Sequence, residues 1–247
     1  MKFNSNEFIP LGAPSFGQED IKEVIDSLES GWVGTGPKVS QFEKSFGKYV
    51  GGESSLATNS CTAALHLSLM SLGLKPGDEV ITTPMTFCAT INTIIHSGAT
   101  PVLADCNIDD FCIDPERISE KITKKTKAIL PVHFAGMSCD MEKIMQLADD
   151  HCLFVIEDCA HAIETTFNDK HAGTFGDFGC FSFYATKNLV TGEGGMLIAR
   201  DDSKLQQIKK IALHGMSLDA WDRFSEKGFK HYDIVAPGFK YNMTDIQ

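Results

Sequence analysis

The stretch AILPVHFAGMSCDMEKIMQLADDHCLFVIED, residues 128–158, contains the pattern that decides the fold. Two short apolar runs flank an amphipathic segment, which predicts strands over Ala128–Phe134 and Leu153–Glu157 and a helix over Met141–His151. A strand, a helix and a second strand in succession are typical of parallel strands joined by a crossover connection. The stretch therefore indicates an α/β fold.

The same alternation continues along the chain on both sides of this unit. Helical patterns cover Thr62–Leu72 and Thr86–Ser97. The remaining predicted strands are Ser55–Thr58, Glu79–Thr83, Thr100–Ala104, Cys180–Tyr184 and Met196–Ala199. We therefore expect a mostly parallel seven-stranded sheet that is sandwiched by helices, because crossover helices cover both faces of such a sheet.

The first 50 residues lack the alternation of strands and helices that the rest of the chain shows. We expect residues 1–50 to form an N-terminal segment with one amphipathic helix, near Glu19–Ser30. The glycine-rich turn Gly31–Pro37 follows this helix. Residues 51–247 are then expected to form one large domain.

Composition excludes several classes of protein. The 247 residues include 22 Lys and Arg against 33 Asp and Glu, a net charge of −11, which argues against general nucleic-acid binding. No window has the roughly 18 apolar residues of a transmembrane helix, and the opening MKFNSNEFIP lacks the apolar stretch of a signal peptide. The eight cysteines are scattered and predict reduced thiols, so we expect a cytoplasmic protein without membrane partners.

Polar residues follow the predicted strands where those strands end. They are Asn59–Thr62, Met85–Phe87, Glu157–His161 and Ser182–Asn188. Because ligands of open α/β sheets bind at the carboxyl ends of the strands, we expect these four segments to meet at one edge of the sheet.

Two of these segments have a functional and a purely structural interpretation. Ser60 and Thr62 start a helix whose free N–H groups could bind a phosphate, yet Ser and Thr are also ordinary N-cap residues. Asp158 ends a buried apolar run, and a buried carboxylate needs a partner. That partner could be the protonated pyridine nitrogen of pyridoxal 5'-phosphate (PLP), a Lys or Arg side chain, or a helix terminus.

His161 and Lys187 are the other candidates for chemistry. His161 could face a cofactor or be a satisfied core histidine, and its spacing from Cys152 and Cys159 matches no usual zinc site, so we expect no metal. Lys187 lies in a turn before the glycine run Gly192–Gly195, where partial burial could make its amine a nucleophile. Neither a P-loop nor a G-x-S-x-G motif is present, and Gly34-Thr35-Gly36 lacks the strand and helix of a dinucleotide fingerprint.

Taken together, several phrases resemble the DegT/DnrJ/StrS-type sugar aminotransferases, a branch of the fold-type I PLP enzymes. The matching phrases occur in the family's order from near Gly12 to the last residue. They are SGWVGTGPKVSQFE (30–43), ATNSCTAALHLSLMSLGLKPGDEVITTPMTF (57–87), TKAILPVHFAGMSCDM (126–141), VIEDCAHAIE (155–164), FGCFSFYATKNLVTGEGG (178–195) and PGFKYNMTDIQ (237–247).

The resemblance implies roles for particular residues of this chain. Lys187 matches the Schiff-base lysine, Asp158 the partner of the pyridine nitrogen, His161 the neighbour of the ring hydroxyl and Phe87 the aromatic that stacks on the ring. The residues implied in phosphate binding are Ser60, Cys61 through its backbone N–H, Thr62, Ser182 and, from a neighbouring subunit, Asn242. The residues implied in contacts with a sugar nucleotide are Val33, Gly34, Thr35 and Gly36.

The implied activity is transfer of an amino group from an amino acid, by analogy glutamate, to a keto sugar carried by a nucleotide. HGMSLDAWDRF (214–224) and PGFKYNMTDIQ look most like enzymes acting on 4-keto UDP sugars, including the one that makes UDP-4-amino-4-deoxy-L-arabinose for lipid A. The resemblance also implies a homodimer with shared active sites. The family pattern continues beyond its Y-N-x-x-D-x-Q segment, so the resemblance implies that the family's smaller C-terminal domain is absent from these 247 residues.

Three alternatives remain at the level of sequence. Some relatives carry histidine in place of the lysine and catalyse dehydration, whereas Lys187 favours transamination. A non-catalytic, truncated PLP-binding fragment is the second alternative, and the end of the chain at Gln247 supports it. A Rossmann-type oxidoreductase is the third, and the missing fingerprint argues against it.

Overall fold

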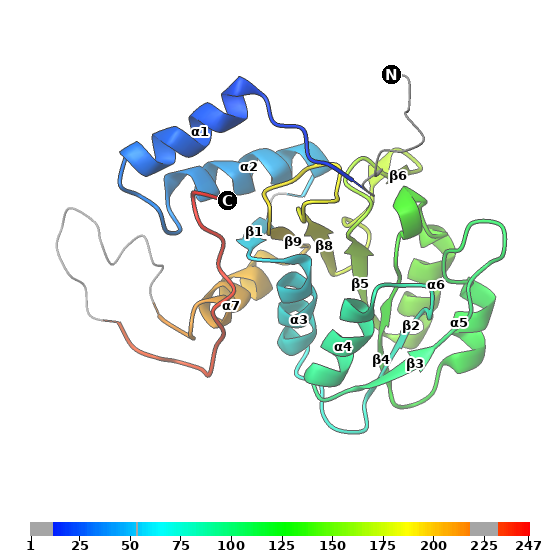
Figure 1. The fold of residues 1–247 in the computed structure, drawn as a ribbon. Helices are drawn as coiled ribbons and strands as arrows, with labels where there is room; N and C mark the ends of the chain where they lie inside the picture. Colours follow the sequence, from blue (N-terminus) through cyan, green and yellow to red (C-terminus); the bar gives the residue numbers. More distant parts are fainter. Residues whose placement is uncertain (1–11, 53, 218–231) are drawn as a thin grey trace, which may run out of the picture.

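The computed structural model describes residues 12–52, 54–217 and 232–247, and its centre is the predicted seven-stranded sheet (Figure 1). The strand order is β1-β9-β8-β5-β4-β2-β3. Neighbouring strands from β8 to β3 run parallel, and β9 is antiparallel to both β8 and β1. The strands are Ser54–Thr58 (β1), Glu79–Thr82 (β2), Thr100–Leu103 (β3), Thr126–Leu130 (β4), Phe154–Cys159 (β5), Phe178–Ser182 (β8) and Gly195–Ala199 (β9).

Helices connect and cover these strands. They are Gln18–Glu29 (α1), Pro37–Val50 (α2), Cys61–Ser71 (α3), Cys88–His96 (α4), Pro115–Lys121 (α5), Met141–His151 (α6) and Asp202–Ala212 (α7), with a short 3₁₀ turn at Phe134–Gly136 (η1). Thr166–Phe167 (β6) and Lys170–His171 (β7) form a separate two-stranded hairpin. Within the described residues, no helix combines the length and apolar character that crossing a bilayer requires.

Successive residues of the strands point to opposite faces of the sheet, and each face has its own apolar core. On one face, Ile156 and Leu197 contact a core that includes residues of α3, α4 and α7. On the other face, Val155 packs with α5 and α6, and Phe181 packs with α2. Both faces are therefore covered, as the sequence predicts.

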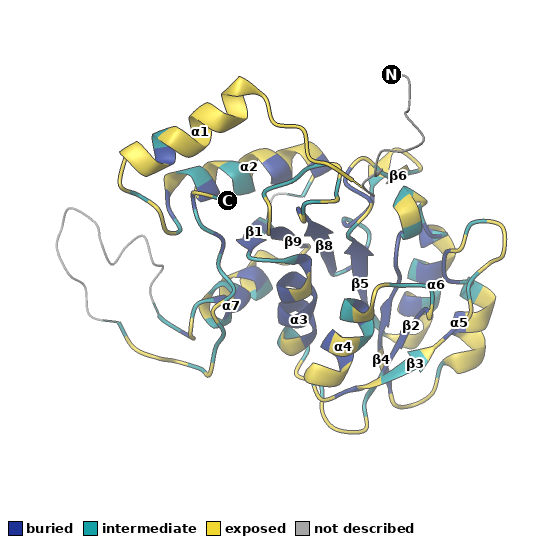
Figure 2. Cartoon of the chain, in the orientation of Figure 1, coloured by how far each residue is buried: buried dark blue, intermediate teal, exposed yellow. Residues whose placement is uncertain are grey.

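Helix α3 lies at the centre of the first of these layers, where it is dark blue along most of its length (Figure 2). Apolar residues occupy all of its sides, which is typical of a helix that is buried all round. Its start, after Ser60, is consequently fixed in position at the edge of the sheet.

All seven predicted strands are present, with some shifts in their ends. The sequence predicted a strand over Ala128–Phe134, but β4 begins at Thr126 and ends at Leu130. Pro131 follows and has no N–H to donate, so the regular strand ends there, although Val132 still forms an isolated parallel bridge with Asp158 of β5. The last predicted residue of that strand, Phe134, instead starts η1.

The prediction of one helix in residues 1–50 was wrong, because α2 follows α1. Pro37 occupies the first turn of α2, a position where proline is favoured, and Phe46 packs edge-on against Phe181 and Phe183 at 5.0 and 5.4 Å between ring centroids. The turn expected over Gly31–Pro37 therefore leads directly into a helix that buries one face. Residues 218–224 of the predicted HGMSLDAWDRF phrase lie outside the described residues.

Candidate active site

The carboxyl edge of the sheet brings the start of α3 into contact with the start of β9. Gly195 pairs with Thr58 of β1 on one side and with Ser182 of β8 on the other. A Cβ atom at Gly195 would lie 2.5 Å from both the Cys61 nitrogen and the Ser60 carbonyl carbon. A glycine is therefore needed here for the close approach that the glycine run predicted.

The first turn of α3 has donors available at this point. Ser60 is the N-cap residue, and its Oγ accepts a hydrogen bond from the Ala63 N–H at 3.1 Å. In the part of the chain that the structure describes, the N–H groups of Cys61 and Thr62 have no acceptor. The capping and the phosphate-binding interpretations of Ser60 are thus compatible, because the cap uses only one of the free donors.

Asp158 is buried near the end of β5 and faces α4. Its Oδ2 accepts a hydrogen bond from Thr90 Oγ1 at 2.8 Å, and its Oδ1 accepts one from the Ala160 N–H at 3.1 Å. Burial raises the pKa of this carboxyl group, and the two donors oppose that rise only in part. Two donors leave acceptor capacity on the carboxylate, so a cation beside it would favour the ionised form.

Thr90 is in turn held by a second hydroxyl group. The Thr86 and Thr90 hydroxyl oxygens lie 2.7 Å apart, and since Thr90 donates to Asp158, Thr86 donates to Thr90. Phe87 precedes Thr90 by three residues, at the N-cap of α4, and its ring is 78% exposed. The exposed ring of Phe87 is therefore free to stack on a ligand.

His161 and Lys187 line one cavity of about 550 Å³. The Lys187 N–H donates to the Tyr184 carbonyl oxygen at 2.8 Å, which closes the turn after β8. Burial lowers the pKa of Lys187, whereas the nearby Cys61 and Asp158 act in the opposite direction. Desolvation at the cavity wall and the positive charge of Lys187 lower the pKa of His161. Burial at the cavity wall thus shifts both groups towards their uncharged forms.

Thr35, Gly36 and Asn242 lie near one another, and Asn242 forms an isolated bridge with Thr58 of β1. These three residues line a second cavity, of about 590 Å³, and do not line the Lys187 cavity. Asn242 Nδ2 donates to Thr35 Oγ1 at 2.7 Å, and Thr35 Oγ1 donates to the Met243 carbonyl oxygen. The other residues of the predicted substrate loop, Val33 and Gly34, are exposed beside it.

The sequence of residues 14–247 matches the profile of the DegT/DnrJ/EryC1/StrS aminotransferase family. The chain belongs to this family. It is 52% identical over 242 residues to the spore coat polysaccharide biosynthesis protein SpsC of Bacillus subtilis, covering 98% of this chain and 62% of SpsC. The chain therefore spans less than two thirds of this relative's length.

Solved structures agree with this assignment. The PMP form of Spr1654 from Streptococcus pneumoniae, named as a sugar aminotransferase, superposes with a TM-score of 0.90 and 37% identity, over 97% of this chain and 65% of that one. Its PLP form gives a TM-score of 0.88. PseC of Helicobacter pylori, an aminotransferase of pseudaminic acid biosynthesis, gives 0.87 with 31% identity, over 96% of this chain and 62% of that one. The fold is that of fold-type I PLP aminotransferases, and the cofactor these relatives indicate is PLP.

The residues of this chain fit that cofactor. A buried carboxylate with spare acceptor capacity suits a protonated pyridine nitrogen, and the free N–H groups of Cys61 and Thr62 suit a phosphate. Lys187, with a lowered pKa, lines the adjoining cavity and offers the amine that the cofactor requires.

Several residues at this edge escape sequence reasoning. Thr90 holds Asp158 directly and Thr86 holds Thr90, and their only signal in the sequence is that the two threonines are four residues apart around the start of α4. Glu157 lies in the predicted strand-end segment Glu157–His161, but its sequence context predicts no role for it. In the structure, Glu157 is as buried as the apolar residues around it. A carboxylate is buried to this extent only when it has several hydrogen-bond partners.

Proposed function

We propose that this chain is the cofactor-binding part of a PLP-dependent aminotransferase. It would move an amino group from an amino acid, glutamate by analogy, onto the keto group of a nucleotide sugar. The product would enter surface polysaccharide, lipid A or amino-sugar biosynthesis, and a 4-keto UDP sugar is the substrate that the sequence resemblance favours. The name of SpsC, a spore coat polysaccharide protein, supports a polysaccharide pathway.

One observation carries the proposal. Asp158, the start of α3 at Cys61 and the Lys187 amine come from three separate segments of the chain, and Cys61 and Asp158 are near enough to Lys187 to affect its pKa. When bound, PLP supplies an electron sink that stabilises a carbanion next to nitrogen. Asp158 would keep the ring nitrogen protonated, and the α3 N–H groups would hold the phosphate.

Lys187 would have two roles in this reaction. Its Nζ would first bind the cofactor, and after displacement by the donor it would carry a proton between the donor's Cα and the cofactor carbon. The lowered pKa of Lys187 supports this second role, because it increases the share of the amine that is neutral and able to accept that proton. A base held in place makes the transfer effectively intramolecular, which is worth about 7–11 kcal/mol in well-oriented systems.

The experiment is an absorbance titration of the purified chain loaded with PLP. Adding glutamate should convert the spectrum to that of pyridoxamine phosphate, and adding a 4-keto UDP sugar should restore it. The Lys187→Ala variant is the control and should convert at a small fraction of the wild-type rate. A dehydrated sugar as product would indicate a dehydratase. PLP binding without any response to glutamate would indicate the non-catalytic fragment.

We also propose a homodimer with shared sites. The resemblance implies that Asn242 reaches the phosphate of a neighbouring copy, and in its own chain Asn242 does not line the cavity that contains Lys187. Sedimentation of the chain, combined with PLP titration of Asn242→Ala, tests this arrangement. A dimer in which the variant retains PLP less tightly is expected. A monomer that binds PLP tightly, with the variant unchanged, would contradict it.

A further inference from the structure

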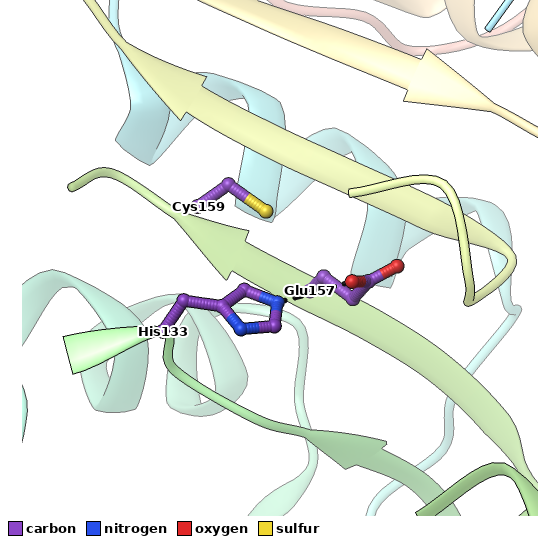
Figure 3. Close-up of side chains that lie close together, drawn as sticks. All are labelled: His133, Glu157 and Cys159. Atoms are coloured by element: carbon purple, nitrogen blue, oxygen red, sulfur yellow. Dashed lines mark hydrogen bonds and ion pairs between the residues drawn. The ribbon is translucent and has the colours of Figure 1, made fainter. Parts of the chain in front are cut away.

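His133, Glu157 and Cys159 form a buried group (Figure 3). Each offers one atom that could bind a metal ion, and these three atoms lie within 4.8 Å of one another. The Glu157 carboxylate already has four partners. Its Oε1 accepts hydrogen bonds from the N–H groups of Phe175 at 2.8 Å and Gly176 at 2.7 Å. Its Oε2 accepts one from the Gly173 N–H at 2.8 Å and lies 3.0 Å from His133 Nε2. Both carboxylate oxygens are thus satisfied without a metal ion.

The hydrogen bonds of His133 define its protonation state. Its Nδ1 accepts a hydrogen bond from the Cys139 N–H at 3.2 Å and therefore carries no proton. The proton of the neutral ring is then on Nε2, which donates it to Glu157. Burial raises the pKa of the third member, Cys159, well above its usual value, so it is a thiol and not a metal-binding thiolate. The group is a structural hydrogen-bond network.

This network closes the segment 133–139. The His133 N–H donates to the Asp158 carbonyl oxygen at 3.1 Å, and its side chain binds the other end of the segment at Cys139. Between these ends lies η1, in which Ala135 has φ 51° and Gly136 has φ 85°. A non-glycine residue in the left-handed region persists only where its surroundings hold it. Here the surroundings include Thr165, whose Oγ1 donates to the Gly136 carbonyl oxygen at 2.7 Å.

The left-handed conformation of Ala135 has a consequence for the candidate active site. It directs the Ala135 N–H to His161 Nδ1, at 3.3 Å. A backbone N–H can only donate, so His161 Nδ1 must be the unprotonated acceptor. Ala135, Gly136 and His161 all line the cavity that contains Lys187. The strained turn is therefore part of the wall of the site.

We propose that the buried His133–Glu157 pair is a positioning pair for His161. By holding the turn at Ala135, it fixes His161 as the tautomer with its proton on Nε2. His161 then offers an N–H donor, and not a lone pair, to an anionic oxygen of a ligand in the cavity. The proposal rests on the proposed function only for the identity of that ligand, which would be the ring hydroxyl oxygen of PLP.

The test is long-range ¹H–¹⁵N NMR of the chain with ¹⁵N-labelled histidine, measured without PLP. The spectrum reports which nitrogen of each imidazole is protonated, and His161→Gln and His133→Gln variants assign the two rings. In the wild-type chain, His161 Nδ1 should resonate as an unprotonated nitrogen and Nε2 as a protonated one. A proton on His161 Nδ1 would overturn the proposal, whatever the variants do.

Two variants then test the role of the positioning pair. Glu157→Gln places an amide NH₂ among donors, so His161 should change to a mixture of tautomers, seen as a shift of both nitrogens towards each other. Ala135→Val changes an exposed residue and disfavours the left-handed backbone, so it should produce the same shift even if Glu157→Gln does not fold. Ala135→Gly keeps both the N–H and the conformation and should retain the wild-type pattern.

An unchanged wild-type pattern in Ala135→Val, or in a folded Glu157→Gln variant, would contradict the positioning role. These outcomes are independent of the proposed function, because no PLP is present. If His161 Nδ1 is unprotonated and the variants change it as expected, but the chain binds no PLP, only the proposed function is contradicted. If PLP binds Lys187 and His161 carries its proton on Nδ1, the positioning proposal fails alone.

Discussion

Asp158 combines complete burial with an incomplete set of hydrogen-bond donors. The structure gives it one hydroxyl and one N–H donor, and burial raises its pKa. Replacing it by asparagine removes the negative charge and keeps the shape, so we expect the fold to persist. In the PLP-loaded chain, the single-turnover rate with glutamate should fall by about 10²–10³-fold, as for other preorganised charges.

Thr90→Val is the matched control for Asp158→Asn. It removes one donor and retains the carboxylate, so the loss of rate should be smaller than that of Asp158→Asn. Near-normal turnover in Asp158→Asn would mean that Asp158 has only a structural role.

The partial burial of Lys187 should change how the reactivity of its amine depends on pH. Burial disfavours the charged amine, so Lys187 loses its proton at a lower pH than an ordinary lysine, and only the neutral form reacts. In a pH series of amine acylation, followed by peptide mass spectrometry, Lys187 should reach half-labelling below the pH of exposed lysines such as Lys48 and Lys75.

The negative charge of Asp158 allows a second test with the same measurement. The negative charge of Asp158 raises the pKa of Lys187, so Asp158→Asn should move half-labelling to a still lower pH. A curve for Lys187 that coincides with those of the exposed lysines would contradict the assignment of Lys187 as a partly buried amine.

At the scale of elements, the close approach of β9 to α3 depends on a glycine, Gly195, which has no side chain. Gly195→Ala would place a Cβ 2.5 Å from the backbone of Ser60 and Cys61, so β9 and α3 must separate. We expect a loss of about 1–3 kcal/mol in the free energy of unfolding, as for other overpacked sites, together with weaker PLP binding. Urea denaturation and PLP titration measure the two effects.

Gly34→Ala is the matched control for this change. A Cβ at Gly34 would meet nothing within 4 Å, so its unfolding free energy should stay within about 0.5 kcal/mol of wild type. Equal stability of the two variants would show that the contact between β9 and α3 does not need glycine.

The elements themselves were largely predictable from sequence, and the exceptions have physical causes. Met141–His151 was predicted residue for residue, because an aspartate caps its start and its apolar residues have helical spacing. Helix α2 was missed because Gly36-Pro37 reads as the end of a turn, although Pro37 also suits the first turn of a helix. Helix α7 has the same local signals as α6, an aspartate cap and helical spacing, and was overlooked.

At the scale of the whole molecule, one carboxylate joins the C-terminal residues to the N-terminal helices. Helix α2 has no side-chain cap of its own, and Asp245 accepts hydrogen bonds from the N–H groups of Gly36 at 2.8 Å and of Lys38 and Val39 at 3.1 Å. Asp245→Ala would leave these donors unpaired and should destabilise the chain by about 1–2 kcal/mol. Urea unfolding followed by circular dichroism measures this loss.

A local cap provides the comparison for Asp245. Asp201 is exposed and caps α7 through the Ser203 N–H at 2.8 Å, so Asp201→Ala should cost less, about 0.5–1 kcal/mol. If Asp245→Ala costs no more than Asp201→Ala, the C-terminal segment does not hold α2 in place.

The sequence could predict which segments meet at the site, but not the network that supports them. Apolar runs and the polar residues that end them were enough to bring Ser60, Asp158 and Lys187 to one edge. The contacts of Glu157 with the backbone of residues 173–176, and that of Ala135 with His161, depend on backbone geometry. Because backbone donors are the same for every residue type except proline, such contacts leave no pattern in the sequence.

Borohydride reduction tests whether Lys187 is the residue that binds PLP. The chain is incubated with PLP, reduced with borohydride, digested and mapped by mass spectrometry. The pyridoxyl group should be found on Lys187, which lines the cavity beside His161. A pyridoxyl group on Lys170 or Lys204, with Lys187 unmodified, would contradict the account.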